Sequence, residues 1–251
     1  MSFQIRKAKI LGLLEQAGGA VDVRQLAASL DLSDMTVRRD LNALAEQGLI
    51  IRTHGGAMLP GLADRPVSFA GKSAQQHEAK EHIARRAAAE IVDGDVIFMD
   101  CGSTVFALCP YIRQKRITVI TNSLPVVAEL MRSTVTLNLV GGEVDKERQA
   151  VHGLTAESHI ARYRADKAFV GVDGVSVGNG LSANGEKEAT LTLALMRQAN
   201  TVYLLCDASK LEQDRYLQFA PLSAVEVLVT DPSAPDEVVQ TFVDAGVRVI
   251  R

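Results

Sequence analysis

The residues best suited to chemistry in this chain stand directly after short apolar runs. Gly102-Ser103-Thr104 follows the run 96–99 and precedes a helical pattern that begins at Val105. Small and hydroxylic residues at a helix start offer backbone N–H groups to an anion, so this loop is a candidate phosphate site. Lys210 follows a later run and would add a point charge. The alternative interpretation of the loop is an ordinary helix cap, and that of Lys210 is an ordinary surface lysine.

Seven apolar runs separated by helical stretches predict a mainly parallel sheet covered on both faces, and hence an α/β fold. The runs are 96–99, 117–120, 135–140, 168–172, 202–206, 225–229 and 247–250. Parallel sheets bind ligands at the carboxyl ends of their strands. The candidate ligand-binding residues at these ends are Asp100, Gly102, Ser103, Thr104, Thr121, Asn122, Gly141, Gly142, Asp173, Asp207 and Lys210.

The first 57 residues have the apolar spacing of three short helices. The first presents one face to a core through Ile10, Leu13, Leu14 and Ala17. Asp22 and Ser33 are suitable N-caps for the second and third helices, and Gly48 is a suitable stop. Two short helices joined by a tight turn predict a helix-turn-helix. The run 49–52, Gly55-Gly56 and the run 57–59 predict a β-hairpin wing.

The third helix carries the pair Arg38-Arg39. At about 100° per residue, Arg39 faces away from the core position Val37. Arginine on such a helix can read guanine or hold a phosphate in a DNA major groove, although a pair of this kind can also simply keep a surface helix soluble. Asp40 would repel phosphate, so we expect it to pair with an arginine or a backbone amide. The candidate DNA-contacting residues are Ser33, Met35, Thr36, Arg38, Arg39, Arg52 and His54.

The segment from Ser33 through Arg38-Arg39-Asp40-Leu41 to His54-Gly55-Gly56-Ala57 resembles the DNA-binding signature of DeoR-family bacterial repressors. The resemblance implies a winged helix-turn-helix that binds double-stranded operator DNA. The later loops, from about residue 75 to 231, resemble the effector domain of the same family, which is related in fold to ribose-5-phosphate isomerase. That resemblance implies a small phosphorylated metabolite, such as a sugar or polyol phosphate, as the effector.

Individual residues of the isomerase have counterparts here by resemblance. Its phosphate loop is matched at residues 102–104, its Asp-Ala-Ser-Lys element at residues 207–210, and its acidic strand-end residue at Asp173. Glu188 is similar to its catalytic glutamate, with Glu186 as a competing match. The DeoR family often has a lysine four residues after the Glu188 position, where this chain has Thr192. This departure bears on which ligand the site takes.

Composition and charge narrow the class of protein. The chain has 251 residues, is 47% hydrophobic and has a net charge of −3, values typical of a globular protein with more than one domain. Three cysteines without a CxxC pair and five scattered histidines argue against a disulfide framework, a metal site or another cofactor. The lack of a long apolar run argues against a membrane anchor or signal peptide, so we expect a cytoplasmic protein.

The predicted organisation is a DNA-binding domain over residues 1–57, a linker over 58–74 and an effector-sensing domain over 75–251. The sensing domain begins with an amphipathic helix, roughly 75–91, with His77, Lys80, Arg85 and Arg86 on its solvated face. Because a DNA-binding domain of 57 residues contacts few base pairs, we expect the protein to form a homodimer or homotetramer.

Three functions are compatible with this organisation. The favoured interpretation is a non-enzymatic, ligand-controlled repressor. The alternatives are a phosphosugar isomerase with an appended DNA-binding module, and a DNA-binding activator or architectural protein whose sensor domain binds nothing.

Overall fold

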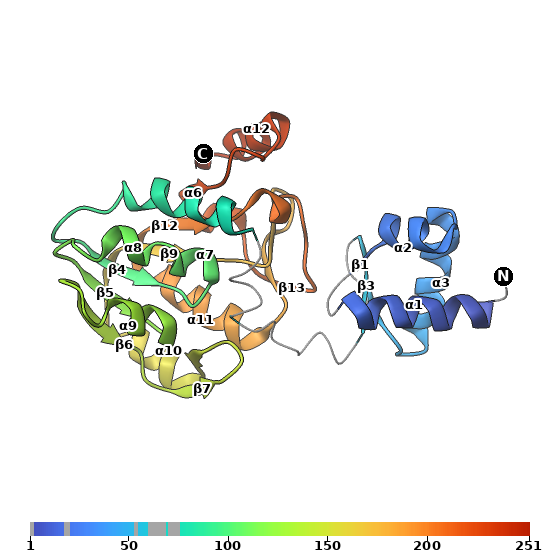
Figure 1. The fold of residues 1–251 in the computed structure, drawn as a ribbon, viewed down its shortest axis with the longest axis horizontal. Coiled ribbons are helices and arrows are strands. Elements are labelled where there is room, and N and C mark those ends of the chain that lie inside the picture. Colours follow the sequence, from blue (N-terminus) through green and yellow to red (C-terminus); the bar gives the residue numbers. More distant parts are fainter. Residues whose placement is uncertain (1–2, 18–20, 53–54, 60–68, 70–75) are drawn as a thin grey trace. The chain divides into compact units, whose positions relative to one another are not determined.

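The computed structural model describes residues 3–17, 21–52, 55–59, 69 and 76–251. The chain forms two compact units, the first built mainly from Met1–Pro66 and the second from Val67–Gln213 and Leu217–Arg251 (Figure 1). Of the predicted linker 58–74, only Met58, Leu59 and Phe69 are described. Each unit has its own apolar core.

The first unit combines three helices with a small antiparallel sheet. The helices are α1 (Phe3–Ala17), α2 (Val23–Leu30) and α3 (Asp34–Glu46), and the strands are β1 (Val21–Asp22), β2 (Ile51–Arg52) and β3 (Gly56–Met58). The strand order is β1-β3-β2, so β3 pairs with β2 as the predicted wing hairpin and also with β1. The sequence gives no sign of β1, because two residues are too few to show a strand pattern.

Local sequence signals fix the two helices that form the helix-turn-helix. The Asp22 side chain accepts a hydrogen bond from the Arg24 N–H at 2.7 Å, and the Ser33 hydroxyl accepts one from the Thr36 N–H at 3.3 Å. Both predicted N-caps are therefore confirmed. The predicted inner face of the first helix is only partly right: Ile10 and Leu14 are fully buried, but Ala17 is exposed at the helix end.

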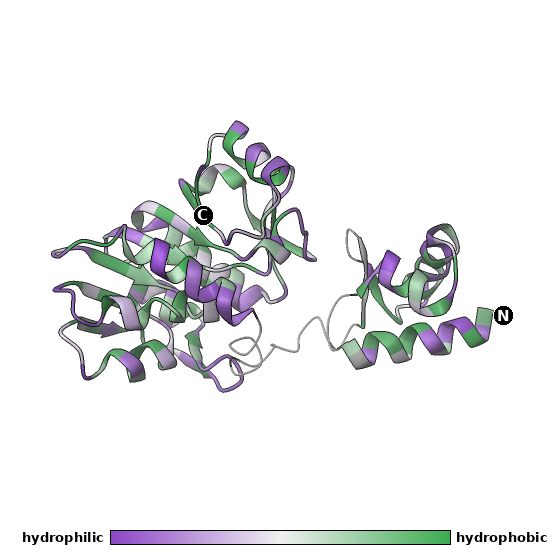
Figure 2. Cartoon of the chain, turned by 45° about the horizontal axis from the view of Figure 1, so that its top comes forward, coloured by the Kyte–Doolittle hydropathy of each residue, from purple (hydrophilic) through white to green (hydrophobic). Residues whose placement is uncertain are grey.

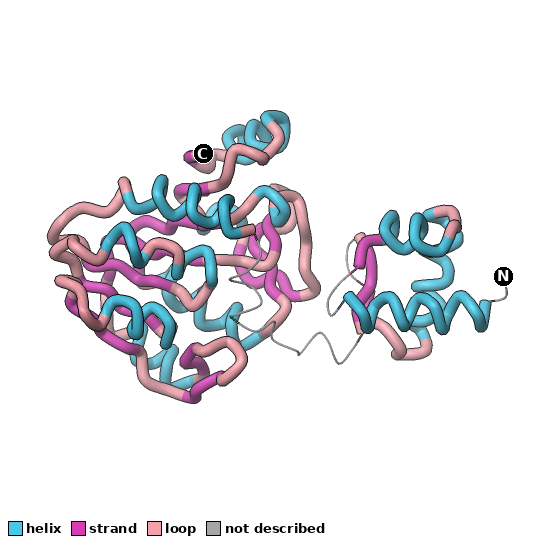
Figure 3. Tube along the Cα trace, in the orientation of Figure 1, coloured by secondary structure: helices cyan, strands magenta, loops and turns pink. Residues whose placement is uncertain are grey.

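The second unit is built on a seven-stranded parallel sheet. Its strands are β4 (Val96–Met99), β5 (Thr118–Thr121), β6 (Thr136–Leu139), β9 (Ala165–Val170), β12 (Ala199–Leu205), β14 (Val227–Val229) and β15 (Arg248–Ile250). They follow the order β15-β14-β12-β9-β4-β5-β6, and every neighbouring pair is parallel. The predicted sheet is confirmed, each of the seven apolar runs having become one strand (Figure 3).

Helices cover both faces of this sheet, as predicted. Successive residues of a strand enter different cores, so Ile97 and Met99 pack on one face and Phe98 on the other. The first face carries α6 (His77–Ala88), α7 (Ser103–Phe106), α8 (Cys109–Ile112) and α9 (Leu124–Leu130), and the second carries α10 (Leu154–Ile160), α11 (Glu186–Arg197) and α12 (Asp236–Asp244). Figure 2 shows the resulting apolar strands between helices of mixed polarity.

The predicted helix 75–91 is observed as α6, but one expectation about its faces is wrong. Arg85 and Arg86 are exposed as expected, whereas Lys80 is buried, with 6% of its surface exposed. Lys80 lies three residues before Ile83, so helical geometry turns it toward the same core. A long aliphatic stem lets a lysine pack in this way.

Short antiparallel strands were missed by the sequence analysis. They form a hairpin of β7 (Glu143–Asp145) and β8 (Ala150–His152) and a three-stranded sheet of β10 (Gly174–Ser176), β11 (Gly180–Ala183) and β13 (Leu217–Ala220). Strands β8, β10 and β11 are buried throughout, so no alternation of polar and apolar residues marks them. Two 3-10 turns, η1 (Ala208–Lys210) and η2 (Leu222–Ala224), complete the unit.

Within the described ranges, no helix combines the length and the apolar character needed to cross a membrane.

Candidate functional site

The outer face of α3 presents the predicted DNA-contacting side chains. Arg38 and Arg39 are exposed, and Met35 is 79% exposed although it is apolar. Ser33 and Thr36 lie at the start of the helix, where their hydroxyls are 2.9 Å apart. The helix therefore offers two guanidinium groups and a small hydroxylic N-terminus to a partner.

A buried ion pair holds α3 from behind. Arg6 of α1 donates from Nε to Asp40 Oδ2 at 2.5 Å and from Nη2 to Asp40 Oδ1 at 2.9 Å. The Asp40 side chain is only 2% exposed. The structural role predicted for Asp40, pairing with an arginine, is confirmed, and the carboxylate is kept away from the outer face.

Arg52 stands at the base of the wing. Its Nη1 donates to the Gly56 carbonyl oxygen at 2.9 Å. Burial lowers the pKa of the Arg52 guanidinium, and the nearby positive charge of Arg38 lowers it further. Arg38 and Arg52 thus share one positive region. His54, the remaining predicted contact, lies outside the described residues.

The second candidate site lies where the strand order of the large sheet reverses. Strand β4 is first in the chain, yet its neighbours are β5 on one side and β9 on the other. The loops after β4 and β9 therefore leave in opposite directions, and open α/β sheets bind ligands at such a point. We call this part of the carboxyl edge the β4–β9 crevice. Gly102 and Gly171 face each other there: a Cβ built on Gly102 would lie 3.8 Å from the Gly171 Cα.

The Gly102-Ser103-Thr104 loop enters this crevice from β4. Ser103 and Thr104 are 8% and 3% exposed, at the start of α7. Among the described residues, neither side-chain hydroxyl makes a hydrogen bond within the protein. Two hydroxyl groups are thus available at the position predicted to hold a phosphate.

Lys210 reaches the crevice from the end of β12. Its Nζ donates to the Val172 carbonyl oxygen at 3.0 Å and lies 3.7 Å from Asp207 Oδ2. Asp207 is 2% exposed and caps η1 by accepting from the Ser209 N–H at 3.2 Å. The Asp207–Lys210 element therefore places a cation beside the loop that follows β9.

Asp100 is the innermost carboxyl group of the crevice. It is 2% exposed and accepts hydrogen bonds from the Cys101 N–H at 2.7 Å and from the Thr192 hydroxyl at 3.1 Å, with a long contact of 3.5 Å to the Gly171 N–H. Thr192 stands where DeoR-family proteins often have a lysine, and it is therefore a direct neighbour of Asp100.

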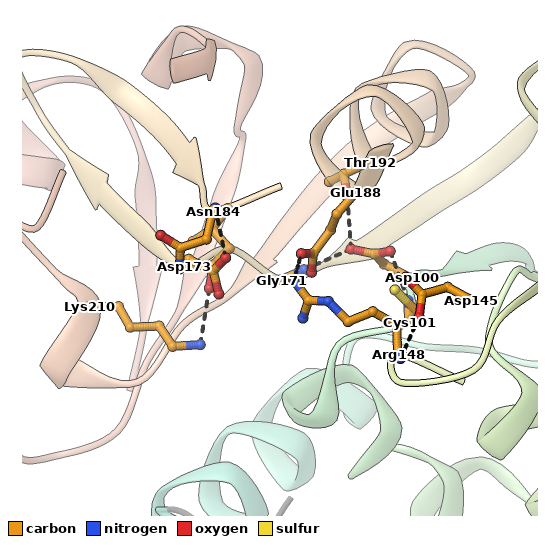
Figure 4. Close-up of polar contacts among 11 residues, drawn as sticks. Asp100, Cys101, Asp145, Arg148, Gly171, Asp173, Asn184, Glu188, Thr192 and Lys210 are labelled. Carbon is orange, nitrogen blue, oxygen red and sulfur yellow. Dashed lines mark hydrogen bonds and ion pairs between the residues drawn. The ribbon is translucent and has the colours of Figure 1, made fainter. Parts of the chain in front are cut away.

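Glu188 lies one turn before Thr192 on α11 and forms an ion pair with Arg148. Figure 4 shows this pair and the Asp100–Thr192 contact on one side of Gly171, and Lys210 with Asp173 on the other. The Asp173 carboxylate accepts a hydrogen bond from the Asn184 N–H at 3.0 Å. The structure thus brings the predicted residues of β4, β9, α11 and η1 together.

Residues predicted from β5 and β6 lie on the same edge but make contacts within the protein. The Thr121 hydroxyl donates to the Met99 carbonyl oxygen at 2.6 Å, and the Asn122 amide donates to the Val151 carbonyl oxygen at 3.2 Å. The Gly141 N–H donates to His159 Nδ1 at 3.1 Å, and a side chain on Gly142 would collide with the β8 backbone. These contacts fix the loops around the crevice.

Two further residues of the crevice were missed, Arg148 and His152 of the β7–β8 hairpin. His152 is 2% exposed, and its Nδ1 atom has no hydrogen-bond partner. Burial lowers the pKa of its imidazole, and the negative charges of Asp100 and Asp145 raise it by less. The only sequence signal was indirect: a charged turn at residues 145–148 between two short apolar-containing segments after Gly141-Gly142.

Comparisons with known proteins agree with this two-part arrangement. Residues 6–61 match the DeoR-like helix-turn-helix domain, and residues 75–232 match the DeoR C terminal sensor domain. The HTH-type transcriptional regulator GlpR of Haloferax volcanii is 33% identical over 98% of this chain and 96% of its own length. The glycerol-3-phosphate regulon repressor of Escherichia coli is 31% identical over 96% of this chain and 95% of its own.

Among solved structures, ribose 5-phosphate isomerase A of Methanocaldococcus jannaschii matches 55% of this chain and 55% of its own with a TM-score of 0.41 and 24% identity. The family matches cover both units of the chain, and the relatives extend over nearly its whole length. The chain belongs to the DeoR family of helix-turn-helix transcriptional regulators.

Proposed function

We propose that this regulator is a repressor whose operator binding is controlled by a small phosphorylated metabolite held at the β4–β9 crevice. The observation that carries the proposal is the pair of unpartnered hydroxyls on Ser103 and Thr104, at the point where an α/β sheet binds its ligands. Lys210 supplies the positive charge. We assign Asp173 and Glu188 the role of accepting hydrogen bonds from hydroxyl groups of the ligand.

The names of relatives support a phosphorylated effector. One is the glycerol-3-phosphate regulon repressor of Escherichia coli, and another is the lactose phosphotransferase system repressor of Streptococcus mutans, 33% identical over 87% of this chain and 88% of its own. A sugar or polyol phosphate is therefore the class of ligand that we assign to this chain.

We further propose that the ligand is sensed without turnover. A general base must be free to take a proton from its substrate. Asp100 is buried and accepts hydrogen bonds from the Cys101 N–H and the Thr192 hydroxyl, so this carboxyl group is not free in this sense.

On the DNA side, α3 is the proposed recognition helix, with Arg38 and Arg39 as its main readers, helped by Ser33, Met35 and Thr36 and by Arg52 at the wing. A recognition helix of 13 residues covers one half-site, so a two-fold operator requires two copies of the chain. The assembly is proposed to be a dimer or tetramer. Light scattering at micromolar concentration that finds only a monomer would contradict it.

Thermal melting against a panel of phosphorylated compounds tests the proposed effector class. A ligand that binds the folded state raises the melting temperature by mass action. We expect at least one sugar or polyol phosphate to raise it, and the unphosphorylated compound to have no effect at the same concentration. NMR spectra of the bound mixture should show an unchanged ligand. Isomerisation at an enzymatic rate would instead support the enzyme alternative.

A further inference from the structure

A buried ion pair lies inside the proposed effector site. Arg148 Nη2 donates to Glu188 Oε2, and the two side chains are 10% and 17% exposed. Arg148 comes from the turn between β7 and β8, and Glu188 from the first turn of α11. Figure 4 shows the pair next to Gly171 and Asp100 in the crevice. A guanidinium thus lies in the same crevice, on the other side of Gly171 from Lys210.

The pairing with Glu188 can be exchanged if each charge gains a new partner. A partly buried ion pair contributes little net stability, because the loss of hydration offsets most of the attraction, but either charge left alone there would be costly. Phosphate offers arginine the same two-oxygen geometry as a carboxylate and a larger charge. Glu188 does not depend on Arg148 alone, since the first turn of a helix favours a negative charge, and α11 runs for 12 residues.

The backbone that carries Arg148 is fixed, so the exchange needs only a side-chain movement. Asp145 Oδ1 accepts hydrogen bonds from the N–H groups of Glu147 and Arg148, both at 2.9 Å. The next residue, Gln149, has a positive φ of 52°, and its carbonyl oxygen accepts from the Leu124 N–H at 2.9 Å. The turn is therefore held at both ends while its guanidinium points into the crevice.

We propose that Arg148 is an effector-binding residue that changes partner. The phosphate group of the effector takes the guanidinium from Glu188, and the carboxylate released in this way accepts hydrogen bonds from the ligand's hydroxyl groups. Arg148 and Lys210 then hold the anion from the two sides of Gly171. This inference rests on the proposed function, because it requires a phosphorylated ligand in this crevice.

The test measures binding of glycerol 3-phosphate, glucose 6-phosphate and fructose 1-phosphate to the full chain by calorimetry. Arg148→Gln should weaken the best of these ligands by about 10- to 100-fold, the range expected for a hydrogen bond to a charged group. Glu188→Gln should change the affinity by less than about tenfold, because an amide still accepts hydrogen bonds from hydroxyls. Arg132→Gln, which removes an exposed arginine of the same unit, is the matched control and should have no effect.

The double variant Arg148→Gln/Glu188→Gln separates binding from folding. It removes both buried charges, so it should restore any melting temperature that Arg148→Gln loses, without restoring ligand affinity. Equal losses of affinity in the two single variants would make the pair a structural element and overturn the exchange. Undiminished binding by Arg148→Gln and by the double variant would also overturn the exchange. If none of the three compounds binds the parent protein, the proposed function fails and the exchange fails with it.

Discussion

The two units of this regulator present in opposite ways the arginines that we propose to bind DNA and effector. On α3, Arg38 and Arg39 are exposed and ready for a partner, and the buried pair of Arg6 and Asp40 serves only to hold the helix. In the sensor unit, Arg148 is itself buried and paired within the crevice. DNA is too large to enter a protein, so its reader must be formed in advance on the surface. A small ligand is enclosed, so the groups that bind it must already have partners that it can replace.

This comparison predicts different responses to mutation. A change on α3 should weaken DNA binding whether or not the effector is present. A change in the crevice should leave DNA binding intact and remove only its control.

Lys210→Ala should abolish the response to the effector while leaving operator affinity unchanged. Coupling between two sites typically changes affinity by about 5- to 150-fold, and this entire change should disappear. Gel-shift titrations with and without the best melting-shift ligand would measure it. Lys210→Arg, which retains the charge beside Val172, should keep most of the response. Weaker operator binding by Lys210→Ala in the absence of ligand would show that the crevice also contributes to DNA binding, contrary to this account.

Arg38→Ala and Arg39→Ala should each weaken operator binding by about 1–3 kcal/mol, the range for an arginine that reads a base. Circular dichroism should show an unchanged fold, since both side chains are exposed. Lys9→Ala removes an exposed charge from α1 of the same unit and serves as the control. Unchanged affinity for both arginine variants would move the DNA-reading surface away from α3.

Phe69, near the start of the second unit, provides a test of coupling between the crevice and operator binding. Its N–H donates to the Glu147 carbonyl oxygen at 3.0 Å, and its ring lies 5.3 Å, edge to face, from Phe106 of α7. It therefore contacts both the Arg148 turn and the phosphate loop's helix. Phe69→Ala should reduce the coupling by about 0.5–2 kcal/mol without changing ligand affinity. A parallel loss of ligand affinity would make Phe69 part of the binding site instead.

His152 should make the sensor unit weakly sensitive to acid. Burial lowers the pKa of its imidazole below the ordinary value of 6.5, so the unfolded chain takes up a proton more readily. Its contribution to stability is therefore full above about pH 6.5 and is lost as the pH falls, by at most about 1.4 kcal/mol per pH unit. The melting temperature of wild type should fall more steeply on acidification than that of His152→Gln. Equal slopes would contradict this assignment.

The sequence predicts the parts of this molecule whose signals are local. Buried parallel strands appear as apolar runs, and caps such as Ser33 are recognisable from a few residues. The rule that ligands bind at strand ends also located Asp207 and Lys210, and the resemblance added Glu188. The β10–β11–β13 sheet and Arg148 could not be predicted, because short buried strands lack a periodic pattern and because Arg148 meets Glu188 across 40 positions of sequence. Only the folded sheet brings those two charges together.

The central claim is that a phosphorylated metabolite in the β4–β9 crevice controls operator binding. The most direct measurement titrates the best melting-shift compound into an operator-binding assay with the wild-type protein. We expect operator affinity to change by about 5- to 150-fold, with half of the change at the ligand concentration that half-saturates the crevice. A ligand that binds the protein and leaves operator affinity unchanged would contradict the claim.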